Sequence, residues 1–158
     1  MIQRFNLMLF LLTIFLLKAP AVVAQKNDSL VLMKSAEKFI YAFNHFQWEP
    51  FRQSFTADAS IFFPEWDYAT RITGIENIEK TWLQLFPEFM NNPGKYEMEI
   101  SPKNISIQLY GNTALMTFHL GDGVSRLSRR TILWVKRKGT WKIAHLHASF
   151  MKKETVNK

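Results

Sequence analysis

Apolar residues between positions 29 and 46 recur every three or four residues, which is the spacing of one face of a helix. The residues of this face are Leu32, Met33, Ala36, Phe39, Ile40 and Phe43. Asp28 or Ser29 is placed to cap the first turn, because either side chain can accept a hydrogen bond from a free backbone amide. The pattern predicts an N-terminal helix that is interrupted at the polar residues 44–47.

Two shorter elements follow this helix. A second helix is predicted through Pro50, Phe51 and Phe55, since proline is tolerated in a first turn. The Thr-Ala-Asp run at 56–58 is expected to end it. Residues 59–64 are then predicted to form a buried strand, because its centre is wholly apolar.

The second half of the chain changes from helix to strand. A third helix is predicted over residues 75–89, with an apolar side made of Ile78, Trp82, Leu85, Phe86 and Phe89. Strands are predicted over 96–100, 104–110 and 112–120, and a hairpin joins 131–135 to 141–150 around Gly139. The order of helices and strands predicts one α+β domain with an antiparallel sheet of about four or five strands.

The N-terminus has the features of a signal peptide. Arg4 precedes an almost wholly apolar run of 13 residues, 5–17, which is short against the roughly 20 residues that span a bilayer. Small residues then place the cleavage site after Ala24. We therefore expect a signal peptide (1–24), a single domain (25–150) and a basic flexible tail (151–158). The protein would be exported, either to a periplasm or out of the cell, without a stable membrane anchor after cleavage.

Composition limits the partners and the sources of stability. The chain lacks cysteine, which excludes both a lipoprotein anchor and disulfides, so 14 Phe, 5 Trp and 4 Tyr must supply the core. Removing Arg4 and Lys18 with the signal peptide lowers the net charge from +7 to +5. Part of the remaining basic charge is local, at the hairpin turn and in the tail, and is typical of a solvated turn and a soluble tail. Binding of nucleic acid would need a basic stripe interleaved with exposed aromatics, and an exported protein rarely meets that partner. Nucleic acid is therefore not an expected partner.

Two stretches resemble a known group of folds. They are the approach Phe51…Phe55-Thr-Ala-Asp58-Ala and the closing run Trp141-Lys-Ile-Ala-His-Leu-His-Ala-Ser149. Both are similar to the nuclear transport factor 2-like superfamily, in particular its SnoaL-like branch and the association domain of calcium/calmodulin-dependent protein kinases. The resemblance covers about residues 30–150. It implies a cone-shaped, curved antiparallel sheet closed by helices around a pocket, and commonly a dimer that packs the outer sheet faces together.

The resemblance also implies an aromatic pocket wall and a catalytic carboxylate. The candidates for the wall are Phe39, Phe43, Phe63, Trp66, Trp82, Phe86 and Phe89. Glu65 or Asp67, directly after the predicted strand, would act as the base, because burial in an apolar cone raises a carboxyl pKa. Tyr41 would be the hydrogen-bond donor. The second acid of the isomerases has no counterpart, since the corresponding strands offer His119, Arg126, Arg129 and Arg130.

The basic side chains suggest a different use of the pocket. Arg126, Arg129 and Arg130, with Arg71 near the rim, could bind a small carboxylate or another anion. Strand alternation allows at most one of Arg129 and Arg130 to face inward.

A histidine pair lies close by in the sequence. His145, His147 and Ser149 are spaced by two, so they share one sheet face, and His145 is a candidate for ligand binding. A metal site would need a third ligand, and His119 on a neighbouring predicted strand is the only clear candidate. No metal or other cofactor is therefore expected. A hydrogen bond between His147 and Ser149, at the pocket floor or the dimer face, is the simpler interpretation.

Three hypotheses of different class follow. The first is an exported homodimer that binds a small apolar or anionic molecule, such as a carboxylate or an aromatic compound. The second is an enzyme of isomerase, dehydratase or hydrolase type that uses Glu65 or Asp67 together with His147. The third is an assembly scaffold without a ligand. The first is favoured because no complete acid–base set can be assembled from residues expected to face one cavity.

Overall fold

The structure is a computed structural model that describes residues 27–64, 70–91, 98–121 and 126–152. Several sequence-based predictions lie outside these residues. They are the signal peptide, all but the first residues of the tail, the start of the strand predicted from Tyr96, and the rim residues Glu65, Trp66 and Asp67.

The helices lie in the first part of the chain, together with two strands, and the part after them forms the remaining strands of the sheet. The elements are the N-terminal helix (described over residues 27–44), α2 (Trp48–Arg52), β1 (Phe55–Phe62), β2 (Ile72–Thr73), α3 (Ile75–Leu85), a 3₁₀ turn (Pro87–Phe89), β3 (Lys103–Tyr110), β4 (Thr113–Leu120), β5 (Arg126–Arg137) and β6 (Thr140–Lys152). The strands form one six-stranded sheet in the order β2-β1-β6-β5-β4-β3. β1 runs parallel to β6, and all other neighbouring strands are antiparallel. The predicted α+β class is confirmed.

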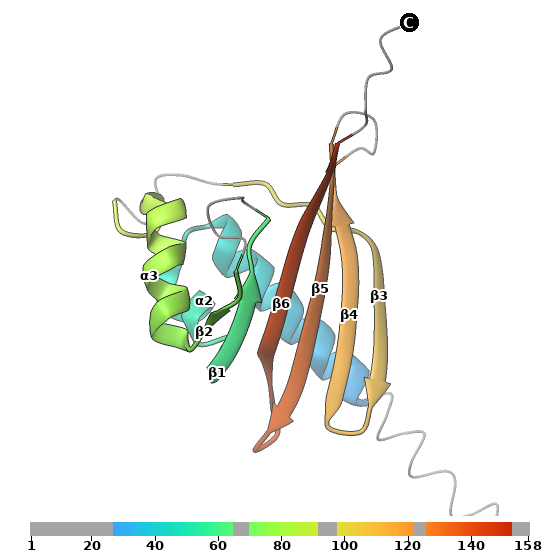
Figure 1. Cartoon of the computed structure of the whole chain (residues 1–158). Coiled ribbons are helices and arrows are strands. Elements are labelled where there is room, and N and C mark those ends of the chain that lie inside the picture. Colours follow the sequence, from blue (N-terminus) through green and yellow to red (C-terminus); the bar gives the residue numbers. More distant parts are fainter. Residues whose placement is uncertain (1–26, 65–69, 92–97, 122–125, 153–158) are drawn as a thin grey trace, which may run out of the picture.

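The helices cover only one face of the curved sheet. In Figure 1 the N-terminal helix runs behind β6, β5 and β4, and α3 stands beside β1, while the other face of the sheet is turned to the viewer. The long hairpin of β5 and β6 forms the middle of the sheet. One layer of helices on one layer of sheet leaves an inner face, which holds the core, and an outer face that no helix covers.

Several boundaries differ from the sequence-based prediction. Residues 56–58 do not end a helix but belong to β1, where the Ile143 amide donates to the Ser54 carbonyl (2.7 Å) beside the strand start. Asp28 does not cap the N-terminal helix; it already lies within it and binds Lys136 on β5. α3 ends at Leu85, because a residue before proline avoids helical geometry and Phe86 (φ −133°) precedes Pro87. Residues 98–100 are not in a strand.

A β-bulge in β6 decides which residues face inward. Leu133 pairs with His145 and its neighbour Trp134 with Ile143, so Ala144 is an extra residue without a partner on β5. Because of this one residue, the odd-numbered Trp141 and Ile143 are buried before the bulge, whereas the even-numbered Leu146 and Ala148 are buried after it. After the bulge, β6 alternates regularly again, with the even-numbered residues facing inward and the odd-numbered residues facing outward.

The core is built around one phenylalanine of α2. Phe51 is fully buried, and its ring lies 4.7–5.8 Å from six other aromatic rings, those of Phe39, Phe43, Trp48, Phe55, Trp82 and Phe89. Such contacts each stabilise by about 0.5–1.5 kcal/mol beyond the burial of area. This aromatic cluster ties the N-terminal helix, α2, β1 and α3 together without a disulfide.

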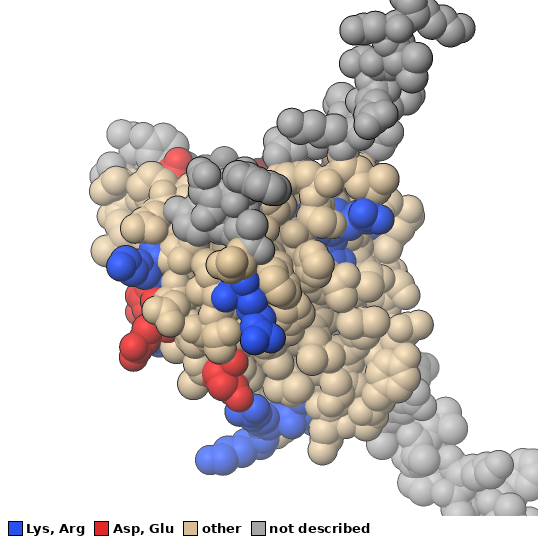
Figure 2. All heavy atoms as spheres, viewed as in Figure 1, with Lys and Arg blue, Asp and Glu red and all other residues tan. Residues whose placement is uncertain are grey.

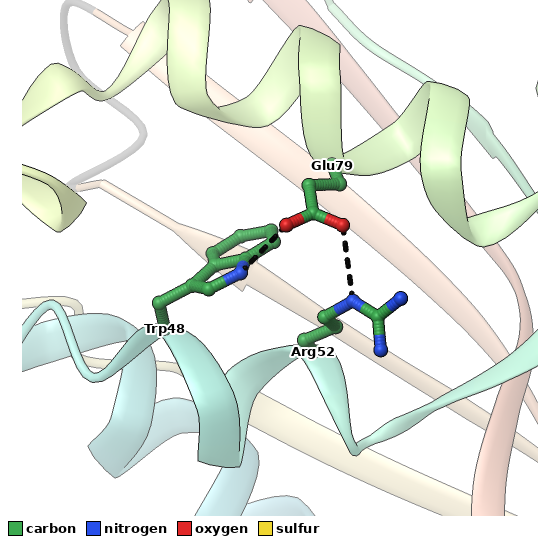
Figure 3. Close-up of polar contacts among 3 residues, drawn as sticks. All are labelled: Trp48, Arg52 and Glu79. Carbon is green, nitrogen blue, oxygen red and sulfur yellow. Dashed lines mark hydrogen bonds and ion pairs between the residues drawn. The ribbon is translucent and has the colours of Figure 1, made fainter.

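A polar contact joins α2 to α3 at the edge of this cluster. Glu79 on α3 accepts hydrogen bonds from Trp48 Nε1 (2.9 Å) and Arg52 Nε (3.0 Å) on α2, as Figure 3 shows. All three side chains are partly buried, so both bonds involve a charged acceptor shielded from water. Within the described part of the chain, no helix has the length and apolar character needed to cross a membrane.

Candidate functional site

A cavity of about 450 Å³ lies between the helices and the inner face of the sheet. The part of its wall that the structure describes is apolar with one exception, and many of these residues are aromatic. The described lining residues are Phe39, Ile40, Phe43, Ile61, Phe63, Pro64, Trp82, Leu85, Phe86, Met98, Ile100, Phe118, Leu120, Arg130, Leu146, Ala148 and Phe150. The volume falls within the range of about 300–1,000 Å³ that is typical of small-molecule sites.

Two helices supply the aromatic wall. Phe39 and Phe43 lie one turn apart on the N-terminal helix, and Trp82 and Phe86 lie one turn apart at the end of α3. The Phe43 ring meets Trp82 (5.7 Å) and Phe86 (5.3 Å) edge to face, so the two helices interlock at this wall. The helical spacing that the sequence shows therefore places four of the expected wall residues at the cavity.

The sheet supplies the opposite wall through strict alternation. Phe118 and Leu120 on β4 and Leu146 and Ala148 on β6 face the cavity, and each is separated from the next by a residue of the outer face. Ile61 and Phe63 do the same at the end of β1.

A third part of the wall is a short segment outside the regular elements. Met98 and Ile100 line the cavity, and the last residues of the N-terminal helix hold them in place. The Asn44 side chain accepts from the Ile100 amide (2.9 Å) and donates to the Ile100 carbonyl (3.3 Å), while the Asn44 carbonyl accepts from the Met98 amide (2.8 Å). Asn44 thus binds residues 98–100 as a neighbouring strand would, which satisfies backbone groups that the sheet leaves unpaired.

Arg130 is the exception in the apolar wall. It lies on β5, half-buried, with its guanidinium 5.7 Å from the centre of the Phe150 ring. Its Nη1 donates to the hydroxyl of the buried Ser128 and to the Arg129 carbonyl (3.1 Å). Arg129 itself is exposed on the opposite face, so one arginine of the pair faces inward, as alternation requires. The side chain of Arg126 lies outside the described residues.

The three histidine candidates, His119 and His145 for ligand binding and His147 for catalysis, do not line the cavity. His119 alternates with the lining residues Phe118 and Leu120, and His145 and His147 flank Leu146. All three histidines therefore lie on the outer face of the sheet. Since His147 is exposed there, it is neither buried with Ser149 nor placed to act on a molecule inside the cone.

The outer face has a small polar cluster of its own. Ser60 on β1 and His145 Nδ1 on β6 are hydrogen-bonded (2.8 Å), and the Phe62 ring contacts both His145 (5.8 Å) and His147 (5.4 Å). Burial lowers the pKa of His145 below its ordinary 6.5, and the nearby His147 and Arg71 act in the same direction. These effects all disfavour the protonated form of His145. Among the described residues, no three His, Asp or Glu side chains gather closely enough to bind a metal ion.

Two further candidates also lie away from the cavity. Tyr41 is 54% exposed on the N-terminal helix, where its ring stacks on His45 at 3.9 Å, so it does not point toward the cavity that Phe39 and Phe43 line. Phe89 is buried against Phe46 (5.1 Å) in the aromatic cluster and is not among the lining residues.

Sequence reasoning missed several residues of the site. Phe118, Leu120, Met98, Ile100, Phe150 and the positioning residues Asn44 and Ser128 were not among the candidates. The apolar strand residues gave a usable pattern, because they alternate with polar ones on β4 and β6. Asn44 and Ser128 gave no such pattern. Asn44 acts on Ile100, which is 56 residues away, and Ser128 acts on Arg130, two residues away, whose inward direction is set by the fold.

Family membership rests on the match of the sequence itself. The chain matches the SnoaL-like domain over residues 33–153 and belongs to this family. Its fold is that of the nuclear transport factor 2-like superfamily, as expected from the closing strand pattern. No curated protein matches the chain by sequence.

Solved structures share this fold at low identity. A candidate dehydratase of the nuclear transport factor 2-like family from Streptomyces avermitilis is 16% identical, with a TM-score of 0.66 over 82% of this chain and 99% of that one. The association domain of CaMKII from C. elegans is 20% identical (TM-score 0.59; 80% and 95% covered). A candidate ketosteroid isomerase from Shewanella frigidimarina is also 20% identical (TM-score 0.57; 73% and 92%). These likenesses establish the fold and leave the activity open.

Proposed function

We propose that the protein binds a small apolar or anionic molecule inside its cone, without converting it, and acts as an exported homodimer. The observation that carries the proposal is the cavity of about 450 Å³ with its almost wholly apolar, largely aromatic wall. A concave site of this volume with mainly apolar and aromatic walls is the usual form of a small-molecule site, which favours a ligand as its occupant.

A thermal-shift screen of the purified protein tests ligand binding. The compounds are aromatic carboxylates, neutral aromatics, steroids and fatty acids. A compound present at 100 times its Kd stabilises the folded state by about 2.7 kcal/mol, which raises Tm by several degrees in a domain of this size. A matched pair of variants locates the site. Ala148→Phe fills the cavity and should abolish the shift, whereas Ala57→Phe on the exposed part of β1 should preserve it. Equal shifts in both variants would place the ligand elsewhere.

An enzymatic function has two supports, both weaker. Structural neighbours are described as a candidate dehydratase and candidate ketosteroid isomerases. Glu65 and Asp67 directly follow the β1 end of the cavity in the sequence, although they lie outside the described residues. Against catalysis, the described lining contains no carboxylate or imidazole, and His147 faces away from it. Glu65→Gln and Asp67→Asn should therefore leave ligand affinity unchanged, and loss of a turnover by either variant would favour the enzyme.

The uncovered outer face of the sheet supports a homodimer. Over β3–β6, Figure 2 shows a surface that is predominantly uncharged, with Lys, Arg, Asp and Glu mainly near its ends and margins. Leu115, Leu133 and Phe62 on this face are only partly buried, and a second copy would cover them. Sedimentation velocity should detect a dimer of the wild-type protein and a monomer of Leu133→Arg. A monomeric wild type at micromolar concentration would refute this part of the proposal.

Export is proposed from the N-terminal sequence alone. The apolar run and the small residues before Gln25 support cleavage after Ala24. Intact-mass measurement of the protein from a native secretory host should give a chain that begins at Gln25. A full-length mass would contradict cleavage.

A further inference from the structure

One side chain in the described wall of the cavity differs chemically from the rest. Among its described lining residues Arg130 has the only ionisable side chain, and the others are apolar. From this contrast we infer that the ligand is an apolar acid, with its hydrocarbon body against the aromatic wall and a single carboxylate bound by the Arg130 guanidinium. The inference rests on the ligand-binding function proposed above and specifies the chemical class of the ligand.

The position of Arg130 is set before any ligand arrives. Its Nη1 donates to Ser128 Oγ and to the Arg129 carbonyl (3.1 Å), and the Phe150 ring lies beside the guanidinium. Ser128 is only 4% exposed, and its own hydroxyl donates to the Ser149 carbonyl (3.4 Å). A guanidinium held in this way loses little side-chain freedom when it binds an anion. Ser128 is therefore a positioning residue for the charge of Arg130.

The surroundings of Arg130 favour an anionic partner over a neutral one. Hydrogen bonds between a guanidinium and a carboxylate are charge-assisted, and they strengthen where apolar walls exclude water. A neutral ligand that displaced water from the guanidinium without supplying a strong acceptor would leave its N–H groups poorly satisfied. Among the described lining residues the only charge is positive, which favours a negatively charged group on the ligand.

A competing explanation is that Arg130 only stabilises the ends of β5 and β6 and binds no ligand. In that case its contacts with Ser128 and Phe150 would stabilise the β5–β6 hairpin, and the charge of a ligand would make no difference to its affinity. The two explanations separate when two ligands share the same body and differ only in charge.

The probes are 1-naphthaleneacetic acid and 1-naphthaleneacetamide, titrated calorimetrically at pH 7 into the purified protein and its variants. The wild type should bind the acid more tightly than the amide by about a factor of ten or more. Arg130→Gln should remove this preference and keep the affinity for the amide. Arg129→Gln, which removes the neighbouring charge from the opposite face, should retain the wild-type preference. Ser128→Ala should weaken binding of the acid but not of the amide.

Each outcome decides between the explanations. Equal affinities of the wild type for both probes would overturn the inference and leave the proposed binding function intact. So would an equal loss of preference in Arg129→Gln and Arg130→Gln. If neither probe binds, the cavity does not take an aromatic body of this size, and the proposed function fails as well. If Arg130→Gln does not fold, Arg130→Lys keeps the charge, and its preference for the acid must survive.

Discussion

The aromatic cluster predicts an unusually large cost for a small change at Phe51. Phe51→Leu keeps an apolar side chain but removes a ring that contacts six others at 4.7–5.8 Å. A buried Phe→Ala substitution costs about 3–5 kcal/mol. Leucine retains part of that burial but none of the ring contacts, which contribute about 0.5–1.5 kcal/mol each and are not additive. We expect Phe51→Leu to lower the free energy of unfolding by about 2–3 kcal/mol.

A matched substitution separates packing from chemistry. Phe62→Leu makes the same change on the outer face, where Phe62 is only partly buried and contacts two imidazole rings rather than a cluster. Its expected cost is below about 1 kcal/mol. Urea denaturation of both variants and the wild type measures the difference, with an unchanged m-value as the check that all unfold in two states. If Phe51→Leu costs no more than Phe62→Leu, the six ring contacts do not organise the core.

The same substitution should also affect the cavity. Phe39, Phe43 and Trp82 line the cavity on one side and pack against Phe51 on the other. Loss of the ring behind them frees the wall to relax, so Phe51→Leu should weaken ligand binding although residue 51 does not line the cavity. Unchanged affinity would show that the wall is rigid without this support.

Three further predictions concern single contacts. Glu79→Gln should cost about 1–3 kcal/mol in urea denaturation, because the charged acceptor for α2 is lost, and an unchanged midpoint would show that the contact adds nothing. Lys138→Asn should stabilise by about 0.5–1 kcal/mol, since Lys138 (φ 51°) precedes Gly139 (φ 80°) in a turn that favours Asn-Gly; a lower thermal midpoint would contradict this. Because the pKa of His145 is lowered on folding, the unfolded chain binds its proton more readily, and stability should fall as pH drops through 6.5. His145→Gln should flatten that dependence, and equal slopes for both proteins between about pH 7.5 and 5 would refute it.

Local periodicity, together with the family resemblance, placed the helical wall of the cavity. Helical spacing places Phe39 with Phe43 and Trp82 with Phe86 on one side of each helix, because a helix fixes the direction of each side chain relative to its neighbours, and the family resemblance assigned these sides to a pocket. The sheet was harder to predict, since the face of a strand residue depends on where counting begins. Alternation correctly separated Arg129 from Arg130 but could not tell which of them faces inward, because that depends on pairing with strands far away in the sequence.

Long-range contacts explain the remaining differences. Residues 56–58 have the composition of a turn, yet they form part of β1, because the pairs on either side of them, Phe55–Ile143 and Ser60–His145, join this strand to β6. Residues 98–100 have the apolar pattern of a strand, yet their backbone groups find partners in Asn44 instead of the sheet. In both places the local preference was weak and tertiary hydrogen bonding decided the outcome.

The bulge at Ala144 makes the chemistry of the cavity depend on strand register as well as on residue type. If Ala144 paired with Leu133 in a regular ladder, the end of β6 would shift by one residue and turn over. His145, His147 and Ser149 would then face the cone, and Leu146, Ala148 and Phe150 would face outward. The cavity wall would acquire two imidazoles and a hydroxyl without any substitution. Within this fold, one unpaired residue thus keeps the groups that could transfer protons on the outer face of the sheet.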